Sequence, residues 1–205
     1  MKLSRILIAA GLLFVGLILY FSTTSGPSGE EYAVMINDER IKKNAFLKED
    51  ETSPLGESRN TFTNLNYFPA DPRYKVLADL DPVANKQVRL LPTSTGEESR
   101  YLEYAWASFE LDGNENKLLI LEIMDMGVNR GKLFLAFADD TSAGETYGGG
   151  RYLDLKKIPA ATSIELDFNK AYNPYCAYND GYSCPMPPPE NILHIAIRAG
   201  EKNYK

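Results

Sequence analysis

The residues best suited to chemistry lie in the C-terminal half of the chain. Cys176 and Cys184 are its only cysteines and His194 is its only histidine. In an oxidising compartment an even pair this close favours a disulfide. The alternatives are two buried thiols, a zinc site completed by a carboxylate, or a cysteine nucleophile with His194 as base. Because the spacing of the cysteines is not a standard zinc spacing, we expect the disulfide and no metal site.

A second set of candidates consists of polar and tyrosine side chains in the same region. Convergent polar groups beside aromatic rings are the usual lining of a ligand pocket. The alternative is that these side chains only satisfy the backbone of their own loops. The sequence predicts a binding site formed by Asp139, Tyr147, Arg151, Asp167, Asn169, Tyr172, Asn173 and Asn191.

An enzymatic function is the second hypothesis. A hydrolase could use Arg151 with Asp139 or Asp167, or Cys176 as a nucleophile. The chain has no Gly-x-Ser-x-Gly elbow, which removes the basis for an α/β-hydrolase. The glycine run at 148–150 lacks the Gly-Lys-Ser/Thr of a nucleotide loop. It predicts a tight turn or bulge entering a strand, with an anion-binding loop as the alternative.

The first residues predict a membrane segment. Lys2 and Arg5 precede an uncharged run of 16 residues, 6–21, which as a helix would be about 24 Å long. No Ala-x-Ala site follows, so we expect a retained anchor in residues 1–25, with a cleaved signal peptide as the alternative. Since both basic residues precede the run, the N-terminus should lie inside and the domain outside the inner (cytoplasmic) membrane. Residues 26–29 form a linker, and 30–205 form one domain.

The charge balance limits the class of partner. The chain has 22 Lys and Arg against 28 Asp and Glu, a net charge of −6. Nucleic acid and anionic surfaces would repel such a protein, so we expect no nucleic-acid partner. Tyrosines give rigid contact area with a polar tip. We therefore expect an extracytoplasmic module that binds a small ligand, a glycan or an envelope protein, without a cofactor.

The hydrophobic pattern predicts one helix and then short strands. Residues 30–50 have helical spacing, with an apolar face of Tyr32, Met35, Ile36, Ile41, Ala45 and Phe46. Strand patterns occupy 74–80, 86–91, 100–111, 117–124, 132–138, 162–167 and 192–198. Asp112-Gly113 predicts a hairpin turn, and residues 128–131 predict another turn.

These elements predict a mainly β fold, α+β at most. We expect an antiparallel β-sandwich or barrel with one N-terminal amphipathic helix. Residues 72–140 form its strand-rich core, and 192–205 its final strand and tail. Residues 141–191 are rich in Tyr, Pro and Gly, and their aromatic content predicts an ordered loop region rather than disorder.

Four motifs in the C-terminal half resemble a known family. They are TYGGGRYL at 146–153, DFNKAYNPYCAYN at 167–179, CPMPPPEN at 184–191 and AGEK at 199–202. Together they resemble a bacterial and archaeal family classed as a domain of unknown function, over about residues 30–205. The resemblance implies no activity and no catalytic residue. The chain departs from the family's Asp-x-Thr-Ser-Gly pattern at Ala143, where a turn that needs positive φ would be altered.

Overall fold

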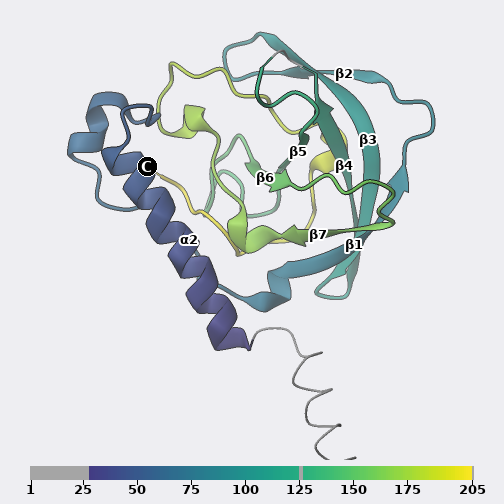
Figure 1. Ribbon diagram of the computed structural model, residues 1–205, viewed down its shortest axis with the longest axis horizontal. Coiled ribbons are helices and arrows are strands. Elements are labelled where there is room, and N and C mark those ends of the chain that lie inside the picture. The colour runs from purple at the N-terminus through teal and green to yellow at the C-terminus, as the bar shows by residue number, and fades with distance from the viewer. Residues whose placement is uncertain (1–27, 125–126, 205) are drawn as a thin grey trace, which may run out of the picture.

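The structure is a computed structural model that describes residues 28–124 and 127–204 (Figure 1). It is mainly β: helix α2 (Gly29–Glu49) precedes one antiparallel sheet of seven strands. This confirms the predicted fold class. The predicted apolar helix at 6–21 lies outside the described residues. Within those residues, no helix is long and apolar enough to cross a membrane.

Helix α2 begins at a capping box. The Ser28 hydroxyl accepts a hydrogen bond from the Glu31 backbone N–H at 3.3 Å, and the Glu31 carboxylate accepts one from the Ser28 N–H at 2.8 Å. This arrangement satisfies two backbone donors that the first turn of a helix leaves unpaired. The helix therefore starts where the linker ends, close to the predicted boundary.

The buried face of α2 is narrower than the predicted apolar face. Tyr32, Ile36 and Leu47 are buried, whereas Met35 and Ile41 are exposed. The predicted face is therefore wrong at Met35, at Ile41 and at Ala45, which is also exposed. Since residues three or four apart share a helix face, the buried residues place positions 40 and 43 on the inward side as well.

The seven strands form one curled sheet. Its strands are β1 (Lys75–Pro82), β2 (Val88–Pro92), β3 (Glu98–Leu111), β4 (Asn114–Ile123), β5 (Leu133–Phe137), β6 (Arg151–Leu155) and β7 (Ser163–Asp167). The order is β6-β5-β4-β3-β1-β7, and β2 pairs with the same edge of β3 as β1. The sheet curls so that β6 and β7 approach each other, but no ladder joins them in the described part of the chain (Figure 1). The fold is thus a half-barrel and not the predicted sandwich or closed barrel.

The hairpin between β3 and β4 follows the prediction. Asp112 and Gly113 have positive φ values of 51° and 75°, which a two-residue hairpin turn of the I′ type requires. A bulge between Glu103 and Ala105 shifts the register of β3 against β4. Bulges bend a strand and increase its twist, which contributes to the curl of the sheet.

Both faces of the sheet are buried at its centre, in strands β4 and β5. Four successive residues of the central strand β4, Leu118–Leu121, are each 0% exposed. Even-numbered residues of this run point into the main core, which the C-terminal segment closes through Ile197 and Ala199. Odd-numbered residues point into a second core with Tyr101, Phe134 and Tyr152. The second face carries the cleft described below.

The predicted final strand, 192–198, does not form. The segment is irregular and runs beside the residues that follow β5, where Leu193 N–H donates to the Ala138 carbonyl and Asp140 N–H to the Ile195 carbonyl. The backbone N–H and carbonyl of Ile197 bond to the side chains of Asp139 and Arg151 and not to a neighbouring strand. The alternation of apolar residues in this segment therefore reflects packing on the main core, without a ladder.

Strand β6 was not among the predicted strands. Its first three residues, Arg151 to Leu153, are all buried, so no polar residue alternates with the apolar ones. Arg151 occupies a position where a strand pattern requires an apolar side chain. Both β6 and β7 lie within the region 141–191. Strand β7 matches the strand predicted at 162–167, whereas β6 follows the predicted turn of the glycine run in a stretch that was otherwise expected to be loop.

Candidate functional site

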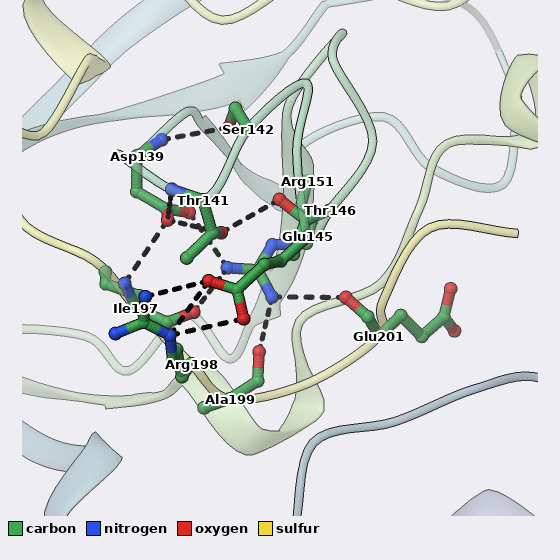
Figure 2. A network of polar contacts seen from close by, with 10 residues as sticks. All are labelled: Asp139, Thr141, Ser142, Glu145, Thr146, Arg151, Ile197, Arg198, Ala199 and Glu201. Atoms are coloured by element: carbon green, nitrogen blue, oxygen red, sulfur yellow. Dashed lines mark hydrogen bonds and ion pairs between the residues drawn. The ribbon is translucent and has the colours of Figure 1, made fainter.

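Arg151 lies in a buried network that Figure 2 shows. Its side chain is 1% exposed. Nη2 donates to Asp139 Oδ2 at 2.8 Å and to the Ile197 carbonyl at 2.9 Å. Nη1 donates to the carbonyl oxygens of Ala199 and Glu201. Through these bonds Arg151 holds the C-terminal segment against the start of β6.

The Asp139 carboxylate completes this network with backbone and hydroxyl donors. Its Oδ1 accepts from the Thr141 N–H at 2.9 Å, the Thr141 hydroxyl at 2.6 Å and the Ile197 N–H at 3.2 Å. Burial lowers the pKa of the Arg151 guanidinium, and the Asp139 carboxylate opposes that effect. The predicted pairing of Arg151 with Asp139 is present, but the remaining hydrogen bonds of Arg151 go to backbone carbonyl oxygens.

Asp167 and Asn169 connect the end of β7 to other segments. The Tyr32 hydroxyl of α2 donates to Asp167 Oδ1 at 2.6 Å, and burial beside this carboxylate raises the pKa of Tyr32. The Asn169 side chain donates to the Asp71 carbonyl and accepts from the Asp71 N–H, both at 2.8 Å. Asp167 thus contacts α2 and Asn169, and among the residues that the structure describes it forms no hydrogen bond with Arg151.

Asn191 fills an opening inside the sheet. Its side chain accepts from the Leu119 N–H at 2.7 Å and donates to the carbonyls of Leu119 and Ala136, at 3.0 and 2.8 Å. Strands β4 and β5 pair directly at only two positions, so this amide supplies the hydrogen bonds that the ladder lacks. Asn191 is 0% exposed and acts as a part of the sheet.

Glu201 is a buried carboxylate held by several donors. It accepts from the Asn173 N–H at 2.9 Å and from the Tyr178 hydroxyl at 2.5 Å. Its Oε1 pairs with Lys43 Nζ of α2 at 2.6 Å. The Asn173 side chain donates to the Lys202 carbonyl at 2.9 Å. Glu201 therefore ties α2 to the C-terminal segment and to the Tyr-rich region.

The two cysteines are buried and unbridged. The Cys176 N–H points to Cys184 Sγ at 3.2 Å, and the Tyr147 hydroxyl lies 3.7 Å from Cys176 Sγ. Burial raises the pKa of the Cys184 thiol to about 12, so this thiol is neutral near pH 7. His194 is exposed, and no three His, Cys, Asp or Glu of the described residues gather in a metal-binding group.

The glycine run forms a turn that leads directly into β6, as predicted. Gly150 has φ of 82°, and a Cβ there would lie 2.6 Å from the Phe137 carbonyl oxygen. Its N–H donates to the Tyr147 carbonyl at 3.1 Å, so this donor is not directed at a ligand. Nearby, Ala143 has φ of 62°, a left-handed backbone that glycine favours.

A cleft of about 810 Å³ lies between α2, the second core of the sheet and the Tyr-rich region. Small-molecule sites commonly measure about 300–1,000 Å³. Several segments distant in sequence contribute its aromatic lining: α2, the residues before β1, strands β3, β5 and β6, and residues 172–182. The rings are Phe46, Tyr67, Tyr101, Phe134, Tyr152, Tyr172, Tyr175 and Tyr182.

Polar groups stand at two ends of this cleft. At the α2 end are Arg40 and Lys43, and the Lys43 ammonium lies 4.4 Å from the Tyr172 ring centroid. At the sheet end, the Tyr172 hydroxyl donates to Asp154 at 2.8 Å, beside Lys132. Tyr172 contacts both ends and lies midway along the cleft.

Only Asn169 and Tyr172 of the predicted binding residues line the cleft. Asp139, Arg151, Asn173 and Asn191 are buried in hydrogen-bond networks that hold the fold. Sequence reasoning missed the helix residues of the cleft. The available signal was the interval Tyr32, Ile36, Arg40, Lys43 and Leu47, which places two cations on the buried face of α2.

Arg40 is the most unusual of the cleft residues. Its guanidinium carbon lies 4.5 Å from the centroid of the Tyr67 ring. Its Nε and Nη2 are buried without a hydrogen-bond partner, and so is the Tyr67 hydroxyl. Burial lowers the pKa of Arg40 and raises that of Tyr67. A buried polar atom without a partner points to a missing water, ion or ligand.

Comparison with known proteins agrees with the motifs. Residues 60–202 match the model of the family described as "Protein of unknown function (DUF1684)". The chain belongs to this DUF1684 family. It is also similar to an uncharacterised protein of Haloarcula marismortui, solved in solution by NMR. The two are 36% identical with a TM-score of 0.64 over 84% of this chain and 95% of that one. No curated protein matches the chain.

The DUF1684 match covers the whole sheet and the Arg151 network, but not α2. The cleft therefore combines the family's matched segment with a helix that precedes it. Arg40 and Lys43 lie on that helix, whereas Tyr67, Tyr172 and Glu201 lie within the matched segment.

Proposed function

We propose that this DUF1684 domain is a binding module whose cleft holds a small molecule with an aromatic or apolar body. The observation that carries the proposal is the cleft itself, about 810 Å³ in volume and lined by eight aromatic rings. Rings with polar tips bury a large ligand surface at low entropic cost. A glycan would use the same rings, and it is tested as a separate probe below.

Binding is favoured over hydrolysis by the way the reactive groups are used. The Arg151–Asp139 pair is bonded to backbone and does not line the cleft. Of the cysteines, only Cys184 lines it, and burial keeps its thiol protonated. Hydrolysis needs a nucleophile or an acid–base group in reach of the ligand. The carboxylates that line the cleft, Glu39, Asp154 and Glu201, are already engaged by Lys170, Tyr172 and Lys43.

The test is ligand-detected saturation-transfer NMR on the purified full-length chain. The probes are 3-phenylpropionamide, 3-phenylpropionate and methyl β-glucoside. We expect the phenyl probes to bind, and Tyr175→Ala to weaken them about fivefold, since an aromatic contact contributes about 1 kcal/mol. Tyr175 is 39% exposed at the cleft, so this change leaves the core intact.

Tyr104→Ala is the matched control, because Tyr104 is a partly buried tyrosine outside the cleft. It should leave probe binding unchanged. If neither phenyl probe binds, or if both variants act alike, the cleft is not the binding site. Binding of the glucoside alone would replace the aromatic ligand by a sugar.

We further propose that the domain lies outside the cytoplasmic membrane, held by residues 6–21. The uncharged run after Lys2 and Arg5 supports this orientation. Such a location favours a disulfide between Cys176 and Cys184, only eight positions apart. Protein isolated from its own membrane and alkylated without reductant should carry no alkyl group, lack two hydrogens and retain residues 1–25. Two alkyl groups would contradict the oxidising location.

A further inference from the structure

We propose that the α2 end of the cleft is a carboxylate-binding subsite, in which Arg40 and Tyr67 hold the monoanionic carboxylate of an aromatic or apolar acid. This rests on the proposed function and adds the class of ligand to it. The geometry that carries it is a guanidinium edge that is buried against Tyr67 and has no partner.

The two unpartnered nitrogens of Arg40, Nε and Nη2, form one edge of the planar guanidinium. This edge offers two parallel N–H bonds, which match the two oxygens of a carboxylate. Other arginines of this protein use the same edge in that way. Nε and Nη2 of Arg73 contact Asp71, and those of Arg198 contact Glu145. In Arg89 the two atoms bind Glu103 and Glu190.

Tyr67 adds a further donor beside that edge. Its ring lies against the Arg40 guanidinium at 4.5 Å, and its buried hydroxyl lacks a partner. Three unused donors on two stacked side chains are more than a structural water needs, because each water accepts about two hydrogen bonds.

The surrounding charges select a monoanion. Lys43, the other cation on this wall, is paired with Glu201 at 2.6 Å. Among the described residues, Arg40 has no carboxylate in hydrogen-bond contact, although the Glu201 and Asp167 carboxylates act on its charge at longer range. Beside these two acids a monoanionic carboxylate meets less repulsion than a phosphate dianion.

An exposed ion pair lines the same cleft. Glu39 Oε1 and Lys170 Nζ are 2.7 Å apart, and both side chains are more than 40% exposed. Exposed pairs of this kind contribute little to stability, so a ligand can displace them at low cost. The aromatic rings beyond Tyr172 then receive the apolar body of the acid.

The experiment compares isosteric probes on the full-length chain by isothermal titration calorimetry at pH 7. We expect 3-phenylpropionate to bind about 10- to 100-fold more tightly than 3-phenylpropionamide, as a charge-assisted pair provides. Phenyl phosphate should bind more weakly than the carboxylate. Arg40→Gln should bring the carboxylate-to-amide ratio close to one. Arg198→Gln removes a paired surface arginine and should leave the ratio unchanged.

Thermal stability gives a second readout. If Arg40 serves a ligand, Arg40→Gln removes two N–H donors that have no acceptor in the free protein and should leave its melting temperature nearly unchanged. A lower melting temperature together with a retained carboxylate preference would overturn the proposal in favour of a structural arginine. Arg40→Lys keeps the charge without the fork and should give an intermediate ratio.

The outcomes separate this subsite from the proposed function. Equal binding of amide and carboxylate to the wild type overturns the carboxylate subsite and leaves a binding cleft. Tighter binding of phenyl phosphate would reassign the anion. Absence of binding by every probe overturns the proposed function itself.

Discussion

Replacement of Arg151 by Met is the sharpest test of the buried network. The change removes an ion pair of 2.8 Å and hydrogen bonds to three carbonyl oxygens, and it keeps an apolar stem in place. It also leaves the Asp139 carboxylate, 0% exposed, without its cation. Breaking a buried pair in this way costs about 3–5 kcal/mol. At about 2–4 °C per kcal/mol for a domain of this size, the melting temperature should fall by about 6–20 °C.

The measurement is thermal and urea unfolding of the full-length protein, with hydrogen exchange at the Ile197 amide. That amide donates to Asp139 at 3.2 Å and should lose protection in Arg151→Met. The control is Arg198→Met, which breaks the exposed pair with Glu145 and should cost less than about 1 kcal/mol. The reasoning fails if the two variants lose similar stability. A stable Arg151→Met protein that no longer binds its ligand would return Arg151 to the functional site.

Three further predictions concern backbone conformation and a buried thiol. Ala143→Gly should stabilise the protein by about 0.5–1 kcal/mol, because glycine relieves the positive φ of 62° at some entropic cost; destabilisation in urea would contradict this. Gly200→Ala should cost more than about 2 kcal/mol, since its Cβ would lie 2.5 Å from the Ala171 carbonyl oxygen. Gly96→Ala, with φ of 84° and open space around it, should cost only the backbone strain, and equal losses would refute the clash. In reduced, folded protein Cys184 should resist iodoacetamide at pH 8, because burial raises its pKa from 9.0 to about 12, and intact mass checks this. The contribution of this thiol to the free energy of unfolding should be full below pH 9 and fall as the pH rises through 12, which urea unfolding measures.

Much of the fold follows from local signals. The β3–β4 hairpin rests on Asp112 and Gly113, two residue types that tolerate the positive φ that the turn requires. Helix α2 rests on Ser28 and Glu31, which cap its first turn. Each signal involves residues within a few positions of one another, so it can be read without knowledge of the tertiary structure.

The elements that were predicted incorrectly depend on contacts between distant segments. Strand β6 begins with a buried arginine, and its burial is favourable only because Asp139 and three distant carbonyls surround it. Residues 192–198 alternate like a strand, yet the backbone groups of Ile197 bond to the side chains of Asp139 and Arg151 and continue no ladder. Closure into a half-barrel also depends on these long-range bonds, which periodicity does not encode.

Most residues of the cleft were missed for the same reason. Polar residues in loops predicted a pocket, and most of them bind backbone instead, as Asx side chains often do. The cleft residues with unused donors lie on a helix, where a charge normally faces solvent. Arg40 becomes visible as a site residue only when Tyr67, 27 positions away in the chain, is placed against its guanidinium.

The two buried arginines of this domain are distinguished by what their nitrogen atoms contact. Arg151 uses Nη1 and Nη2 for four protein acceptors, so a ligand could reach it only by breaking the fold. Arg40 has the edge that binds carboxylates elsewhere in this protein, and that edge has no acceptor. Buried N–H donors without an acceptor cost stability in the free protein, and such a cost is retained where binding recovers it. Functional tests on this domain should therefore begin at Arg40, and stability tests at Arg151.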